Sequence, residues 1–264
     1  MAESGRPLYA ALAACALAAV GCGHQSPPPP APPAIALPQK WPTGRAPPIR
    51  ITDELTLSIP LTYQRSAIDR DPHAPPSAPA WLAHQEAHFD FFLPGFTGYT
   101  LQNYRNEEDD SKVEVVYLHA GDPQEAEPDA AGEYPPNMLK RALKESLDPQ
   151  HAASRYGLTC YPGRTAANRL SCFGRRADSA AEDIMVTVPE PPYPEGLAFP
   201  QLQARYFSKR YGGVRIAWRT HVRNFARWRE IDAQIWRFID TWRDAPEPEA
   251  PPAATPAPAT LNRS

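Results

Sequence analysis

The stretch 224–243, "NFARWREIDAQIWRFIDTWR", decides the fold because its apolar residues recur at the spacing of a helix. At 100° per residue, one face of about 160° collects the large apolar side chains: Phe225, Trp228, Ile231, Ile235, Trp236, Phe238, Ile239 and Trp242. Asn224 is a suitable N-cap. We therefore predict an amphipathic helix of four to five turns that packs on a sheet, with an interfacial membrane helix as the alternative.

Asp232 lies inside this apolar arc. A buried carboxylate needs a partner, so we expect a structural bond to an arginine, a histidine or backbone N–H groups. A catalytic acid is the alternative interpretation.

Alternating apolar and polar residues before this helix predict strands. They occur at 55–59, 88–93, 112–118 and 183–188, and in a hairpin over 204–220. One short helix is predicted at 136–147. The fold class is therefore α+β, with a mostly antiparallel sheet, the long C-terminal helix and one short additional helix.

Gly212-Gly213 suits a two-residue hairpin turn. With Tyr211 opposite Val214, the hairpin turns Phe207 and Trp218 toward the core. The outward face would then carry candidate partner-binding residues: Tyr206, Arg210, Arg215 and Arg219. Three interpretations stay open, namely a solvated face, pairing with the chain's own acidic residues, and docking of an acidic partner, since Arg and Tyr often dominate interfaces.

Charge is segregated along the chain. Residues 106–134 contain ten acidic residues and one lysine, whereas 200–243 contain nine arginines and one lysine against three acidic residues. The whole chain carries a net charge of −3. This acidic total, with the envelope location inferred below, argues against nucleic acid as a partner.

The N-terminus has the features of a secretory signal. Arg6 precedes an apolar run at 8–20, which is too short to span a bilayer. The sequence Ala19-Val20-Gly21-Cys22 resembles the lipobox of bacterial lipoproteins, which implies cleavage after residue 21 and a lipid on Cys22. Cys15 is the competing acceptor, and an ordinary cleaved signal is the other alternative. The absence of Asp after Cys22 implies the outer membrane, facing the periplasm.

Proline-rich composition marks both ends of the mature chain. We predict a semi-rigid tether over 22–48 and a disordered tail over 244–264. Residues 49–243 would form a single globular domain, and no apolar run after the signal is long enough to cross a membrane.

Cys160 and Cys172 are the remaining cysteines, and they flank the polar centre of a predicted hairpin, "YGLTCYPGRTAANRLSCFG" at 156–174. In an oxidising compartment such a pair is expected to form a disulfide. A metal site is a poorer alternative, because two cysteines without nearby histidines do not fill a tetrahedral site.

Catalytic motifs of the hydrolase, zinc-protease and phosphate-loop types are missing from the sequence. His84 and His88 fit two surface histidines better than a metal pair, and His221 with Asp232 would form at most a dyad. We therefore expect no enzyme activity, no cofactor and no metal.

The lipobox, the proline-rich spacer, "YGLTCYPG…LSCFG" and "GGVRIAWRTHVRNFARWREIDAQIWRFIDTW" at 212–242 resemble proteobacterial outer-membrane lipoproteins. The resemblance is to immunity lipoproteins that neutralise phospholipase effectors of the type VI secretion system. It implies a periplasmic lipoprotein that binds and occludes a secreted lipase. The alternatives are an envelope-assembly or scaffolding lipoprotein with a resident partner and, third, a hydrolase with an unfamiliar site.

Overall fold

The computed structural model describes residues 41–69, 85–106, 108–127, 134–165, 168–176, 182–193 and 197–243. The predicted signal peptide, Cys15, Cys22, most of the predicted tether and the predicted tail lie outside these ranges, as does His84.

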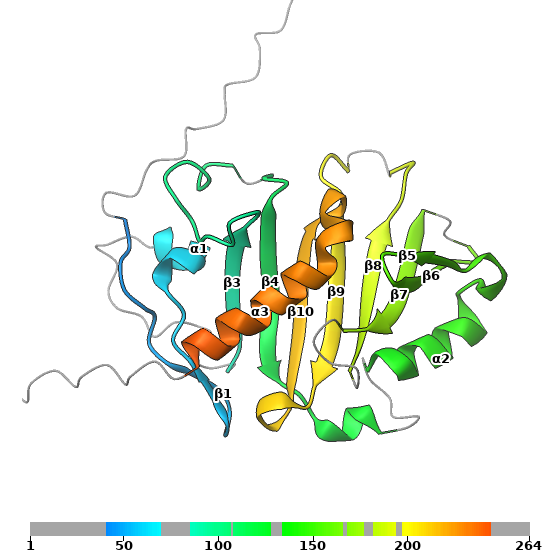
Figure 1. Ribbon diagram of the computed structural model, residues 1–264, viewed down its shortest axis with the longest axis horizontal. Helices are drawn as coiled ribbons and strands as arrows, with labels where there is room; N and C mark the ends of the chain where they lie inside the picture. Colours follow the sequence, from blue (N-terminus) through cyan, green and yellow to red (C-terminus); the bar gives the residue numbers. More distant parts are fainter. Residues whose placement is uncertain are drawn as a thin grey trace, which may run out of the picture. The chain divides into compact units, whose positions relative to one another are not determined.

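An antiparallel sheet of eight strands forms the centre of the fold (Figure 1). In sheet order the strands are β3 (Ala87–Phe92), β4 (Lys112–Ala120), β10 (Val214–His221), β9 (Gln201–Ser208), β8 (Asp183–Pro189), β7 (Arg169–Arg175), β6 (Leu158–Pro162) and β5 (Ala153–Arg155). The predicted mostly antiparallel sheet is therefore confirmed.

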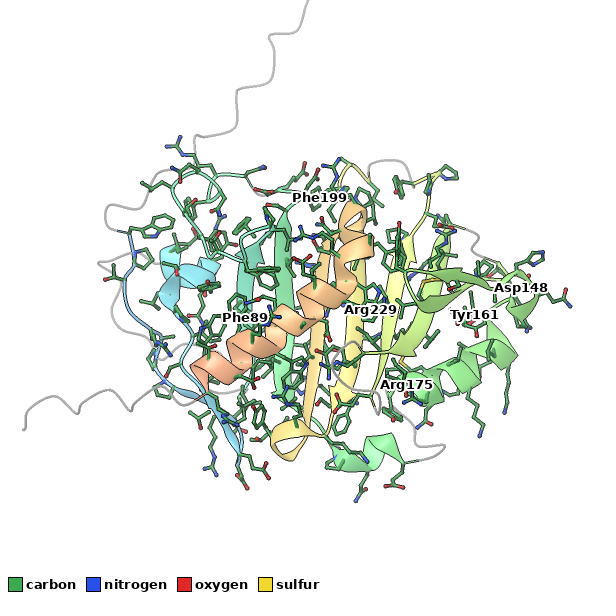
Figure 2. All side chains as sticks on the ribbon, in the orientation of Figure 1. Phe89, Asp148, Tyr161, Arg175, Phe199 and Arg229 are labelled. Carbon is green, nitrogen blue, oxygen red and sulfur yellow. A yellow bond between two sulfur atoms is a disulfide. The ribbon has the colours of Figure 1, made fainter. Side chains whose placement is uncertain are left out.

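Helix α3 (Trp228–Trp242) crosses the sheet diagonally, over β9, β10, β4 and β3 (Figure 1). Its buried residues are Trp228, Ile231, Asp232, Ile235, Trp236, Phe238, Ile239 and Trp242. Phe89 of β3, labelled in Figure 2, is 5.0 Å from Trp242 between ring centroids. We call the sheet face toward α3 the inner face; it includes Val214, Ile216 and Trp218 of β10.

The helix begins differently from the prediction. Residues Val222–Arg227 form a 3-10 helix, η6, and the His221 side chain accepts a hydrogen bond from the Arg223 N–H at its start. The Asn224 side chain instead donates to the Asp110 carbonyl at 2.6 Å and to Thr220 Oγ1 at 2.9 Å. Asn224 therefore ties the start of the helix to the sheet rather than capping it.

A two-stranded sheet of β1 (Ile49–Thr52) and β2 (Leu55–Leu57) belongs to the same core. The Ser58 N–H donates to the carbonyl of Trp242 at 3.1 Å, which joins the end of α3 to the N-terminal region. Contacts begin before β1, since the Ala46 N–H donates to the Ile59 carbonyl at 2.8 Å.

The other sheet face, the outer face, carries two smaller apolar clusters. Helix α2 (Pro135–Glu145) places Met138 and Leu139 against Phe173 and Met185. A second cluster around Phe92 comprises Ile68, Tyr99 and Tyr104, with Trp41 packed against it. Among the described residues, the other short helices are η1 (Leu61–Tyr63), α1 (Arg65–Ile68), η3 (Pro123–Ala126), η4 (Pro149–His151) and η5 (Arg210–Gly212).

Cys160 and Cys172 lie opposite each other on β6 and β7 and are joined by a disulfide. Both cysteines are buried in the main core. The predicted cross-hairpin disulfide is therefore present. Among the described residues, no helix has both the length and the apolar character that a membrane span requires.

The register of the β9–β10 hairpin differs from the prediction. Val214 pairs with Ser208 rather than following a tight turn, so the loop is 209–213, and Tyr211 adopts a left-handed φ of 54°. Consequently Phe207 pairs with Arg215 and faces outward, where Gly121 makes room for its ring. Tyr206 pairs with Ile216 and faces inward. The outward position of Tyr206 and the core position of Phe207 beneath the helix were wrong, while Trp218 is in the core as predicted.

Candidate functional site

The four predicted partner-binding residues do not share one surface. Tyr206 is buried, with 3% of its surface exposed. Arg210 lies in the β9–β10 loop and donates to Asp240 of α3 at 2.8 Å and to the Tyr211 hydroxyl at 3.2 Å. Arg215 and Arg219 alone remain together, on the outer face of β10.

The structure adds two residues to this pair. Ala217 lies between Arg215 and Arg219 on β10, and it pairs with Arg205 of β9 on one side and Tyr117 of β4 on the other. We call Tyr117, Arg205, Arg215 and Arg219 the outer strip. All four side chains are half-buried, between the clusters formed by α2 and by Phe92. A five-residue hairpin loop places Arg205 on the outer face of the sheet. The Gly-Gly motif predicts a two-residue loop instead, which is why Arg205 was not among the predicted residues.

Two arginines of the arginine-rich segment 200–243 form ion pairs with carboxylates of the acidic segment 106–134. Arg219 forms a two-point contact with Glu114 of the acidic segment, with Nε–Oε2 and Nη2–Oε1 distances of 2.9 and 2.7 Å. Arg223 is paired with Asp110. Of the three interpretations of the outward face, pairing with the chain's own acidic residues therefore applies to Arg219, whereas Arg223 was not among the predicted residues. Arg219 nevertheless keeps 43% of its side chain exposed.

The outer strip is a surface rather than a pocket. The hollow between Tyr117, Arg205, Phe207 and Arg215 encloses only about 10 Å³. This volume is comparable to a single water-sized probe, whereas small-molecule sites enclose several hundred Å³. The strip therefore suits a macromolecular surface better than a small ligand.

A larger cavity of about 310 Å³ lies at the edge of the sheet beside β3. Its polar lining includes Arg65, Glu86, His88 and Asp90. Burial raises the pKa of Asp90 above its ordinary value, while the nearby Lys112 ammonium, 3.3 Å away, acts in the opposite direction. His88 is largely exposed, with Nε2 3.5 Å from Glu86. Within the described ranges, no three metal-ligating side chains come together.

Asp232 takes part in an ion cluster beneath α3. Its Oδ2 accepts from Arg176 Nε at 3.0 Å, and both side chains have 0% exposure. Arg176 Nη1 also contacts Glu182, which accepts from Ser208 Oγ at 2.8 Å. The predicted buried Asp232 and its arginine partner are therefore observed, and they join α3 to the residue that directly follows β7 and, through Glu182, to Ser208 of β9.

Tyr206 belongs to this cluster as well. The Arg176 guanidinium lies 4.4 Å from the centre of its ring. Burial, and after it the negative charge of Asp232, raises the pKa of Tyr206 well above its ordinary value. Tyr206 thus stays protonated and helps to surround the buried guanidinium.

His221 does not meet Asp232. Its ring lies 4.9 Å from that of Phe199, which Figure 2 labels at the end of the sheet where α3 begins, and its Nε2 is 3.7 Å from Asp110. The carboxylate of Asp232 is instead paired with Arg176. The dyad considered from the sequence is therefore not formed.

No protein-family model matches the chain, and no curated protein matches it. Among solved structures it is similar to an immunity protein of the Stenotrophomonas maltophilia type IV secretion system, at 12% sequence identity and a TM-score of 0.46. The alignment covers 77% of the present chain and 95% of that protein. A likeness of this degree carries no argument about function.

Proposed function

We propose that this chain is a binding protein of the bacterial envelope that acts by occluding a protein partner. The observation that carries this proposal is the outer strip, where Arg205, Arg215, Arg219 and Tyr117 are accessible in the middle of a sheet whose inner face is buried. Arg and Tyr contribute large contact areas and directional hydrogen bonds, which is why they are enriched at energetically important interface positions.

The buried disulfide supports a periplasmic location for this protein. Disulfides persist in the periplasm and are rare in the reducing cytosol, and the Cys160–Cys172 bond joins two strands of the core. Together with the lipobox-like sequence ending at Cys22, it favours a mature protein moored to the outer membrane by lipid and facing the periplasm.

The finer form of the proposal is an immunity role. In it, the chain binds a secreted lipase or phospholipase effector and blocks its access to the membrane. The resemblance of 156–174 and 212–242 to immunity lipoproteins supports this role, as does the long proline-rich segment that would let the domain reach an enzyme working at the membrane surface.

Co-expression tests the immunity role. A lipase effector encoded beside this protein is directed to the periplasm of a host, with and without the chain, and survival and lysophospholipid release are measured. Protection by the wild-type chain together with co-purification of the lipase is expected. Binding of resident envelope proteins without protection would instead favour the scaffolding alternative.

Replacing Cys22 with serine tests the anchor. The variant is expected in the soluble periplasmic fraction, whereas the wild-type chain fractionates with membranes. Retention of the variant in the membrane fraction would show that Cys22 is not the lipid attachment point.

A further inference from the structure

We infer that the cavity beside β3 binds a guanidinium group carried on an apolar stem, which is the chemistry of an arginine side chain. The cavity encloses about 310 Å³, and pockets that hold small ligands enclose roughly 300–1,000 Å³. None of the outer-strip side chains lines this cavity, so binding there does not depend on the proposed function.

Gln64 is a buried polar side chain without a partner. The residue is 8% exposed and lines the cavity. Its backbone N–H donates to the Leu61 carbonyl. Its side chain, at the start of α1, makes no capping bond, and no described residue forms a hydrogen bond with the amide. An amide kept from water without hydrogen bonds is unfavourable, so the cavity favours an occupant with hydrogen-bonding groups.

Glu86 supplies a negative charge to the same cavity. Its carboxylate is 28% exposed and lies 3.5 Å from His88 Nε2, and this histidine is charged only if protonated. Within the described ranges, no lysine or arginine forms an ion pair with Glu86. A partly buried carboxylate of this kind favours a cation that can donate hydrogen bonds to it.

The other charged groups at the cavity are already in ion pairs. These pairs are Asp90 with Lys112, Glu114 with Arg219, and Arg65 with Asp69. Each pair is neutral overall, so the negative charge of Glu86 matches one positive charge on the occupant. Tyr99 and Lys112 both contact Asp90 through Oδ2, which leaves Oδ1 as a further acceptor.

The apolar part of the lining suits the stem of an arginine. Ile49, Phe89 and Val115 are buried core residues that also line the cavity, so methylene groups would lie against them. A guanidinium is planar, has five N–H donors and is more weakly hydrated than an ammonium group. It can therefore bond both Gln64 and Glu86 at a smaller cost in lost hydration than lysine.

The test titrates the full chain, in an uncharged detergent, with Nα-acetyl-arginine methylamide. Proton–nitrogen NMR follows the side-chain amide signals of Gln64, which are identified by their absence in Gln64→Leu. These signals are expected to shift until the site is saturated. The citrulline analogue has the same shape without the charge, so it should bind about tenfold more weakly.

Variants of the lining separate binding from folding. Glu86→Gln should weaken binding of the arginine probe about tenfold, because it removes a charge-assisted hydrogen bond. Glu108→Gln is the matched control and should leave the affinity unchanged, since Glu108 is exposed and does not line the cavity. Gln64→Leu should also weaken binding, measured by calorimetry, without lowering the Tm, because the amide has no bond to lose. A lower Tm would show that the amide is already bonded and would count against the inference.

The guanidinium can belong to a protein partner or to a free compound, and capture of the lipase effector distinguishes the two sources. Weaker capture by Glu86→Gln would assign the arginine to the effector. Unchanged capture with continued binding of the probe would assign a free guanidinium compound. Equal affinity for the arginine and citrulline probes, tighter binding of the lysine analogue, or unshifted Gln64 signals would overturn the inference. The proposed function would survive these last results, because it depends on the outer strip.

Discussion

Replacing Asp232 with alanine should destabilise the protein by about 3 kcal/mol, because it removes one of the carboxylate partners of the buried Arg176 guanidinium. Removing one member of a buried ion pair typically costs about 3–5 kcal/mol. We expect the lower end of this range of destabilisation, since Arg176 keeps its contact with Glu182, whose side chain is 12% exposed. For a domain of this size, the loss corresponds to a fall of about 6–12 °C in Tm.

Urea denaturation without added oxidant or reductant, monitored by tryptophan fluorescence, measures the change in the free energy of unfolding. Asp240→Ala is the matched control: its carboxylate pairs with Arg210 at the surface with 46% exposure, so the expected loss is below about 1 kcal/mol. The double variant Arg176→Met with Asp232→Leu should recover part of this loss, because it removes both fully buried charges, although Glu182 then lacks its arginine partner. The reasoning fails if Asp232→Ala costs no more than Asp240→Ala, or if the double variant is no better than Asp232→Ala.

Three further expectations concern stability. Replacing both Cys160 and Cys172 with serine should lower the free energy of unfolding by roughly 3 kcal/mol according to the chain-entropy model. Dithiothreitol should destabilise the wild type but not this variant, and equal sensitivity of the two proteins to the reductant would contradict the expected role of the disulfide. Trp242→Ala should cost about 3–5 kcal/mol by leaving a cavity beside β3, whereas Leu197→Ala, at a side chain 41% exposed, should cost little; similar midpoints in urea would count against the assigned core. Because burial raises the pKa of Asp90, the folded state holds this proton more tightly than the unfolded state, so the Asp90 contribution to stability should fall as pH rises from about 4 through the raised pKa. Asp90→Asn should remove that slope from stability measured against pH, and an unchanged slope would refute the assignment.

Local periodicity was sufficient to predict much of the fold. The apolar arc of 224–243 identified α3 and the burial of Asp232, because both follow from residues close in sequence. The cysteine pair was also predictable, since the sequence predicts its hairpin and, from the lipobox-like segment, an oxidising compartment. Arg176 was not identified as the partner of Asp232, because the two residues are 56 positions apart and only the assembled sheet brings them together.

The candidate surface was predicted less well, and one turn explains the difference. The Gly212-Gly213 motif favours a two-residue turn, but Tyr211 also adopts a positive φ and its carbonyl accepts a hydrogen bond from Thr52 Oγ1 at 2.6 Å. This contact with the last residue of β1 stabilises the longer loop, and it depends on tertiary structure. The changed register moved Tyr206 into the core and brought Arg205 to the outer strip.

The position of β10 has a consequence for biogenesis. This strand is synthesised after the other seven strands of its sheet, yet it sits between β4 and β9 and pairs with both. Until it is made, β4 and β9 each lack one neighbour, and long-range pairing of this kind is slow to form. The segments before β10 cannot complete the sheet by themselves, so the eight-stranded sheet forms only after β10 has been synthesised.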